Sequence, residues 1–173
     1  MAGGFNCLHC IHCCFFVGEA ESPIVFPWEK RLLESLLSQA GLPAVFRPVE
    51  AYGPVGDDEC CVAVLYRWVL RGFCPFYDSW NRRCVIHDFK PLACRMFPLL
   101  LELPSGRLLM SGVCDAVPKP PARVDEFFRD EFRAAVTVML LYSGMVEKLS
   151  GLGRAEPGRC RCFVDADIYL GLS

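Results

Sequence analysis

Apolar residues recur at helical spacing in two stretches of the chain. Within positions 28–40, four leucines lie at the spacing that places them on one helix face. Pro27 stands at the expected first turn, and Gly41 follows as a stop signal. The segment 124–149 is patterned over a longer distance, with Asp125 as its candidate N-cap. We therefore expect two principal helices, near 28–40 and 124–149.

Other apolar stretches have the character of strands. β-branched and aromatic residues dominate positions 60–70, which predicts a long strand ending near Gly72. Further along, the apolar stretches 98–103 and 107–113 flank a Pro-Ser-Gly turn, which predicts a hairpin. We expect these three strands to share one small, mostly antiparallel sheet.

The connection 42–59 is rich in proline and glycine and leaves room for one short strand. No internal repeat or linker divides the sequence. The pattern as a whole predicts a single α+β domain over residues 1–173, with two main helices, a small sheet, and cysteine-rich loops gathered at one end.

Composition adds one unusual feature, which is cysteine. The chain has 173 residues, a formal net charge of −2 and twelve cysteines. A chain of this length can bury a hydrophobic core without disulfide support. The charge is close to balanced and no basic run is present, so we do not expect nucleic acid as a partner.

The sequence also favours a cytoplasmic location. The first ten residues lack the positive and apolar regions of a secretory signal. The longest apolar run, 134–142, is much shorter than the roughly 20 residues that span a bilayer, so no membrane contact is expected. Because thiols stay reduced in the cytosol, a dense cysteine pattern there indicates metal binding or catalysis rather than a disulfide framework.

The first cysteine cluster is "CLHCIHCC", which runs from Cys7 to Cys14. A Cys-x-x-Cys step lets one tight turn present two thiolates to a metal, with backbone N–H groups pointing at the sulfurs. This stretch makes the step twice. Adjacent side chains diverge in a helix or strand, so we expect Cys13 and Cys14 not to share one mononuclear site. The cluster therefore predicts either two metal sites or a multinuclear centre.

A second set of cysteines follows later in the chain, three of them at intervals of ten residues. Together the two sets supply enough thiolates for two four-ligand sites. The predicted metal ligands are Cys7, Cys10, Cys13, Cys14, Cys74, Cys84, Cys94 and Cys114.

These motifs resemble a known family. "CLHCIHCC", the "CPF" that begins at Cys74, the intermediate Cys84, and the "CRMFP" that begins at Cys94 match, in order and spacing, the zinc- or iron-chelating proteins named for their Cys-x-x-Cys-x-x-Cys-Cys motif. The match runs from about residue 7 to residue 114. The resemblance implies a metal or iron–sulfur protein. Flagellin lysine methylases carry a similar cysteine domain, so methyl transfer is one activity that the resemblance implies.

The metal itself is left open between two choices. Four thiolates satisfy a structural zinc ion. Repeated Cys-x-x-Cys steps followed by an offset cysteine are more natural around a multi-iron cluster such as 4Fe–4S, where different irons take different thiolates. We therefore favour an iron–sulfur cluster as the cofactor, with zinc as the alternative.

Cysteines outside the matched motifs have less definite roles. Cys60 and Cys61 lie in the predicted strand, and we expect them to pack as small hydrophobic residues. Cys160 and Cys162 form a Cys-x-Cys pair near the C-terminus, for which extra ligands, a redox pair and a local staple all remain open.

Polar residues near the motifs complete the candidate site. Arg95 follows a predicted ligand and is our candidate for cofactor binding, either by offsetting the charge of the cluster or by holding an anionic substrate; the alternative is that it ties down loop carbonyls. We expect the three histidines to lie outside the ligand set, since eight thiols are present: His9, His12 and His87.

The sequence leaves the function class undecided. No glycine-rich phosphate-binding loop is present, and no pair of residues identifies a catalytic acid, base or nucleophile. An enzyme would use the centre for redox or methyl-transfer chemistry. A binding module would use the metal only to hold its loops, or would carry the metal to another protein. The partner, whether a protein or a small molecule, is not identified.

Overall fold

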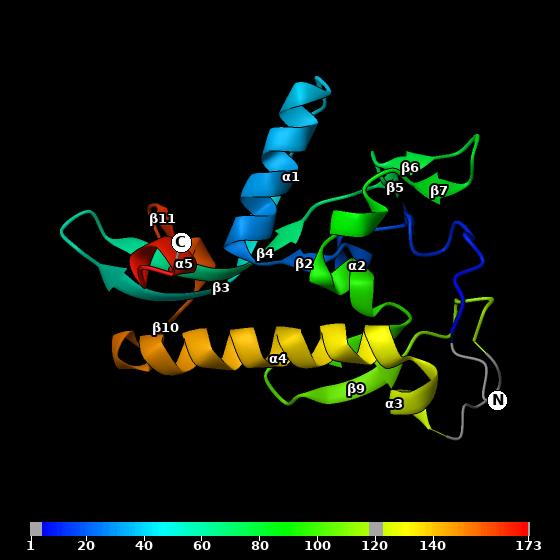
Figure 1. Cartoon of the computed structure of the whole chain (residues 1–173). Coiled ribbons are helices and arrows are strands. Elements are labelled where there is room, and N and C mark those ends of the chain that lie inside the picture. Colours follow the sequence, from blue (N-terminus) through cyan, green and yellow to red (C-terminus); the bar gives the residue numbers. More distant parts are fainter. Residues whose placement is uncertain (1–4, 118–122, 173) are drawn as a thin grey trace. The chain divides into compact units, whose positions relative to one another are not determined.

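The computed structural model describes residues 5–117 and 123–172 (Figure 1). The chain forms two compact units. We call Met1–Glu21 with Leu70–Met139 the cysteine unit, and Ser22–Val69 with Leu140–Ser173 the sheet unit. All eight predicted metal ligands lie in the cysteine unit, and the four remaining cysteines lie in the sheet unit. The α+β class predicted from the sequence is confirmed.

The sheet unit is built on a five-stranded sheet. Its central strand is β4, and every pairing is antiparallel except that of β11 with β4. Most of β4 is buried, which explains its nearly continuous apolar sequence. The strands in spatial order are β10 (Arg154–Ala155), β3 (Phe46–Val55), β4 (Cys60–Trp68) and β11 (Phe163–Asp165), with β2 (Ile24–Val25) also pairing with β4.

Helix α1 (Pro27–Gln39) confirms the first predicted helix. Pro27 occupies the first turn, and the Phe26 backbone N–H donates to the Glu29 carboxylate at 3.0 Å. The leucine stripe is buried at Leu33 and Leu37. The short helix α5 (Ala166–Tyr169) follows β11. Both helices contact β4.

The second predicted helix is interrupted. Its residues form α3 (Val124–Phe127) and α4 (Arg129–Leu149), separated by Phe128, whose backbone leaves the helical region at ψ 52°. The Phe128 ring is fully buried and lies 5.0 Å from the ring of Phe5. The interruption between α3 and α4 thus falls at a residue whose side chain is packed in the core. By length and composition alone, the helix over 129–152 is apolar enough to span a membrane, a test that core helices of soluble proteins also pass.

The predicted hairpin is confirmed as β8 (Leu99–Glu102) and β9 (Arg107–Met110). It forms a two-stranded sheet of its own in the cysteine unit, so the prediction that it joins β4 is wrong. The neighbour of β4 is instead β3, a ten-residue strand within the connection that we expected to hold at most a short one. Its register shifts next to Pro48 and between Tyr52 and Val55 show how a proline-containing strand is accommodated by irregular pairing.

Two disulfides join β4 to the C-terminal segment. Cys60 is bonded to Cys162, and Cys61 is bonded to Cys160. The prediction that Cys60 and Cys61 pack as unbonded hydrophobic residues is therefore wrong, although Cys61 is buried as expected. Cys60 and Cys61 are adjacent in a strand, so their side chains point to opposite faces. Their disulfide partners are the two cysteines of the Cys-x-Cys pair. The Cys-x-Cys pair therefore acts as a staple, but a long-range one across 102 and 99 residues rather than the local staple that we considered.

Acidic side chains are held by polar partners at two places in the sheet unit. The Arg31 guanidinium pairs with the carboxylates of Asp165, at 2.6 Å, and of Asp167, and the Tyr66 hydroxyl donates to Asp165 at 2.7 Å. At a second place, the buried Glu50 carboxylate accepts hydrogen bonds of 3.0 Å from two hydroxyls, those of Tyr52 and Tyr142.

Apart from the first part of α4, the cysteine unit consists of short elements and loops. Its strands pair two by two, β1 with β5 and β6 with β7, beside the β8–β9 hairpin. The elements are β1 (Phe15–Phe16), β5 (Gly72–Phe73), β6 (Tyr77–Asp78), β7 (Arg83–Cys84) and α2 (Leu92–Met96). Single 3-10 turns occur in the two units at Glu19–Glu21, His87–Phe89, Ser150–Leu152 and Pro157–Arg159.

Candidate metal centre

Strand pairing brings the first cysteine cluster to the second set. β1 follows Cys14 directly and β5 precedes Cys74 directly, and the two strands pair with Phe15 opposite Phe73. Their rings pack edge to face with centroids 5.0 Å apart. The Cys74 backbone N–H then donates to the Cys14 carbonyl at 2.7 Å. This register places the start of the chain beside residue 74, as Figure 1 shows for the blue N-terminal segment and β5.

The next two cysteines are positioned by local structure. Tyr77 donates its backbone N–H to the Cys74 carbonyl at 2.9 Å and pairs with Cys84 across β6 and β7. Cys94 lies in α2, which begins directly after Pro91. Burial, followed by the charge of Cys74, raises the pKa of the Cys94 thiol above its ordinary value. A thiol in such a place is ionised most readily when a metal takes up its charge.

Four of the motif cysteines share one local geometry, in which the backbone N–H two residues later points at the sulfur. At Cys7 the donor is His9, with N···Sγ 3.4 Å, and the positive φ of His9 (53°) forms the turn. Burial raises the pKa of the other three thiols, and the same kind of N–H contact opposes part of that rise. The pairs are Cys74 with Phe76, Cys84 with Ile86, and Cys114 with Ala116. The contact at Cys7 is the one predicted for the Cys-x-x-Cys turns, whereas the other three lie outside such turns; all four stabilise negative charge on the sulfurs.

Cys13 and Cys14 lie closer together than we predicted. Their sulfurs are 3.9 Å apart, so the predicted divergence of these side chains is wrong. The reason is that residues 11–14 form a tight turn rather than a helix or strand, closed by a hydrogen bond from Cys14 N–H to the Ile11 carbonyl at 2.9 Å. Two thiolates on one tetrahedral zinc ion lie about 3.8 Å apart, as follows from Zn–S bonds of about 2.3 Å.

Cys13 is the electrostatic centre of the thiol set. A hydrogen bond from the Cys14 thiol, with help from the charges of Lys90 and His12, lowers the pKa of Cys13 to about 6. Its negative charge in turn contributes to raising the pKa of five other motif thiols. These are Cys14, Cys74, Cys84, Cys94 and Cys114.

Cys10 belongs to a second group of potential ligands. Its sulfur, a ring nitrogen of His12 and a carboxylate oxygen of Asp115 lie within 4.8 Å of one another. Asp115 directly follows Cys114 in the loop after β9. Sequence reasoning missed Asp115 and placed His12 outside the ligand set. The only signal in the sequence was the adjacency of Asp115 to a predicted ligand.

Arg95 has a defined place in the structure. Its Nε donates to the Lys90 carbonyl at 2.8 Å, and its Nη2 donates to the Asp88 carbonyl at 2.9 Å. The side chain thus ties together the loop that leads into α2, which was the alternative to a role in binding. Its predicted role in cofactor binding stays a prediction.

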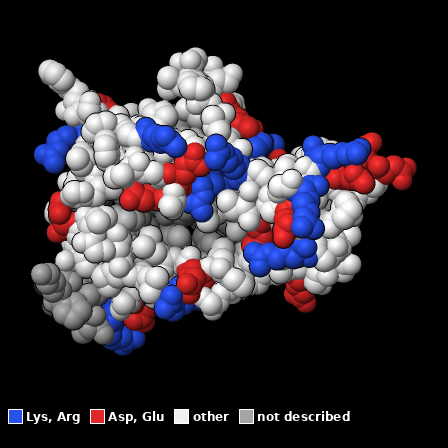
Figure 2. Space-filling model, turned by 180° about the vertical axis from the view of Figure 1, so that it is seen from behind, with Lys and Arg blue, Asp and Glu red and all other residues white. Residues whose placement is uncertain are grey.

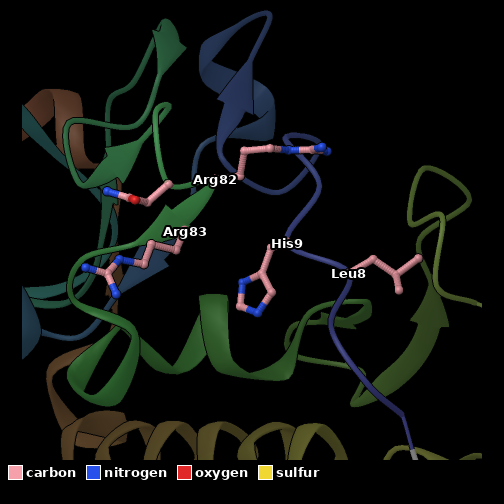
Figure 3. Close-up of a pocket in the computed structure, with 5 residues that line it drawn as sticks. Leu8, His9, Arg82 and Arg83 are labelled. Atoms are coloured by element: carbon pink, nitrogen blue, oxygen red, sulfur yellow. The ribbon is translucent and has the colours of Figure 1, made fainter.

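Two other features lie beside the cysteines. Tyr77 is next to Cys84 in the β6–β7 pair, and its hydroxyl is the single buried side-chain polar atom without a hydrogen-bond partner among the residues that the structure describes. An open surface pocket is lined by Leu8, His9, Asn81, Arg82 and Arg83 (Figure 3). In this view the side chains of Arg82 and Arg83 extend in opposite directions. The two guanidinium groups therefore do not converge on one ligand.

The residues present fit a metal centre. The donors are thiols, which suit zinc and iron–sulfur clusters, and backbone N–H groups are already directed at several of the sulfurs. An orphaned buried hydroxyl at Tyr77 is available to a further polar group. Cys13 and Cys14 are spaced as two ligands of one ion.

Comparison with known proteins agrees with this chemistry. The family model CxxCxxCC, described as "Putative zinc- or iron-chelating domain", matches residues 6–115. No curated protein and no solved structure matches the chain. The match covers all eight predicted ligands and well over half of the chain. The chain therefore belongs to the CxxCxxCC family of metal-chelating domains.

Proposed function

We propose that the cysteine unit binds an iron–sulfur cluster on its motif thiolates and uses it for redox or methyl-transfer chemistry. The observation that carries this proposal is the position of Cys13, whose charge acts on five other motif thiols. A single zinc ion takes four thiolates. Six thiols connected through Cys13 exceed the four ligands of one zinc ion, which favours a centre with more than one metal ion.

An iron–sulfur cluster would supply one-electron transfer. The protein's own groups set the conditions for it. Backbone N–H groups at His9 and Phe76 point at ligand sulfurs, and the charge of Lys90 acts on Cys13, Cys84 and Cys94. Hydrogen bonds to sulfur and nearby positive charge both favour the more negative, reduced state of a thiolate-bound cluster.

The partner of this centre is proposed as a protein or small molecule. On the face shown in Figure 2, Lys and Arg side chains are interspersed with Asp and Glu side chains. Mixed charge of this kind supports the expectation that nucleic acid is not bound. The open pocket beside His9 lies on the segments that carry Cys7, Cys10 and Cys84, which supports a place for a substrate near the centre. We propose a cytoplasmic location, where a thiolate cluster remains reduced; the two disulfides of the sheet unit, which a reducing compartment disfavours, argue in the opposite direction.

The test is anaerobic purification followed by analysis of iron, acid-labile sulfide and zinc, with visible and paramagnetic resonance spectra. We expect a brown protein containing iron and sulfide. A colourless protein with stoichiometric zinc after anaerobic preparation would contradict the proposal. Zinc found only after aerobic preparation is explained by replacement of a lost cluster, so the anaerobic sample decides.

A structural zinc module is the second candidate, and one observation favours it. The 3.9 Å between the sulfurs of Cys13 and Cys14 is close to the edge of a zinc–thiolate tetrahedron, whereas each iron of a 4Fe–4S cluster takes a single protein thiolate. In this case the metal holds the loops of the cysteine unit together without catalysis. The same metal analysis separates the two candidates.

A further inference from the structure

We propose that Cys10, His12 and Asp115 form a separate, solvent-facing site for a divalent ion such as Zn²⁺, distinct from the thiolate centre around Cys13. The proposal reassigns Cys10 from the thiolate set to a site with mixed donors. It does not depend on which metal the thiolate centre holds.

The geometry of the three side chains carries the proposal. One sulfur, one imidazole nitrogen and one carboxylate oxygen lie within 4.8 Å of one another. Ligands around a tetrahedral zinc ion are about 3.3–3.8 Å apart, given bond lengths of about 2.0–2.3 Å. One pair, His12 Nε2 and Asp115 Oδ2, is already at 3.2 Å. Small side-chain rotations that move the donor atoms by about an ångström close the remaining gap, and two of the three side chains are exposed.

The fold brings these donors together from two distant segments. Cys10 and His12 lie two residues apart in the N-terminal loop, and Asp115 lies in the loop that follows the β8–β9 hairpin. The two loops approach each other at Cys10 and at His12, both of which face Asp115.

The donor chemistry selects the class of ion. A sulfur, a nitrogen and an oxygen together suit borderline divalent ions, of which Zn²⁺ is the common one, and suit neither Mg²⁺ nor an all-thiolate iron–sulfur cluster. Three protein ligands leave one coordination position of a tetrahedral ion for water. The side chains of His12 and Asp115 are 42% and 60% exposed, so this position faces solvent.

The competing explanation is an ordinary surface ion pair between His12 and Asp115. Such a pair accounts for their 3.2 Å separation, but it requires no sulfur nearby. The chain contains a matched control, because His87 and Asp88 also form an exposed His–Asp contact, with Nδ1···Oδ1 3.8 Å. The described structure places no cysteine in a potential metal cluster with that second pair.

The test measures zinc binding by the full-length protein with its thiolate centre loaded. Zn²⁺ is supplied from a chelating buffer, and bound zinc and iron are counted separately by metal analysis. We expect one zinc ion beyond the content of the thiolate centre. His12→Ala and Asp115→Asn should each weaken binding of this extra ion at least about tenfold, while the metal content of the thiolate centre stays unchanged. The double variant His87→Ala, Asp88→Asn should bind it as the unmodified chain does.

Three results would overturn the proposal. One is the absence of an extra zinc ion in the unmodified chain. Another is unchanged zinc affinity in both His12→Ala and Asp115→Asn, which would leave an ion pair as the explanation. The third is loss of the tightly held metal in these variants, which would assign both residues to the thiolate centre. A colourless, iron-free protein would refute the iron–sulfur cluster, yet the extra zinc ion would still be measurable.

Discussion

The two disulfides of the sheet unit should stabilise it in a strongly non-additive way. They join Cys60 to Cys162 and Cys61 to Cys160 across sequence separations of 102 and 99 residues. In the chain-entropy model, a bridge that closes a loop of about 100 residues stabilises the folded state by about 4.7 kcal/mol. Once either bridge is present, the other closes a ring of only a few residues, which the same relation values at about 2 kcal/mol.

The perturbation is removal of the bridges in pairs. Cys60→Ala with Cys162→Ala should lower the free energy of unfolding by about 2 kcal/mol, because the remaining bridge still closes the long loop. Cys61→Ala with Cys160→Ala should cost slightly more, since Cys61 is buried. The fourfold alanine variant should lose roughly 7 kcal/mol, about three times the loss from one pair. A total stability of about 5–15 kcal/mol would leave this variant marginal.

Equilibrium urea unfolding without reductant measures these values. Tryptophan fluorescence reports mainly on the sheet unit, because Trp68 there is 2% exposed whereas Trp80 in the cysteine unit is 93% exposed. A phosphine reductant should shift the unmodified chain to the behaviour of the fourfold variant, with metal content measured as a control. If the fourfold loss equals the sum of the two paired losses, or if reductant has no effect, the loop-closure reasoning is wrong.

Three further predictions concern other parts of the chain. Cys94→Ser should lower metal content and the thermal unfolding temperature together, because metal binding at the centre contributes to folding; full retention of metal would contradict the ligand assignment. Arg31→Lys should lower the free energy of unfolding by about 2 kcal/mol in urea, since lysine cannot bridge two aspartates, whereas Arg133→Lys in an exposed pair should change little. Burial, with a neighbouring carboxylate, raises the pKa of Tyr52 to about 12, so the folded chain favours the neutral phenol. Because an unfolded tyrosine titrates near 10, the contribution of Tyr52 to the free energy of unfolding should be fully present below about pH 10 and should be lost as the pH rises toward 12. A free energy of unfolding in urea that does not change over this pH range would refute this.

Features set by short-range spacing were predictable from the sequence alone. The leucine spacing fixed α1 nearly to the residue, and the Pro-Ser-Gly turn at 104–106 identified the β8–β9 hairpin. The Cys-x-x-Cys steps and the later cysteine motifs identified the metal-chelating family, and the ligand set that they suggest stays a prediction. In each case neighbours within a few positions carry the signal, because helix periodicity, turn geometry and ligand spacing are local properties of the backbone.

Features set by contacts between distant segments required the tertiary structure. The pairing of β3 with β4 was obscured by prolines, and the disulfides depend on β11 lying beside β4, about 100 residues away in the chain. The approach of Asp115 to His12 has the same origin. Cys13 and Cys14 are brought together by a tight turn that neither helix nor strand geometry describes. Such contacts depend on which segments pack side by side, and the residue pattern within any one segment does not contain that information.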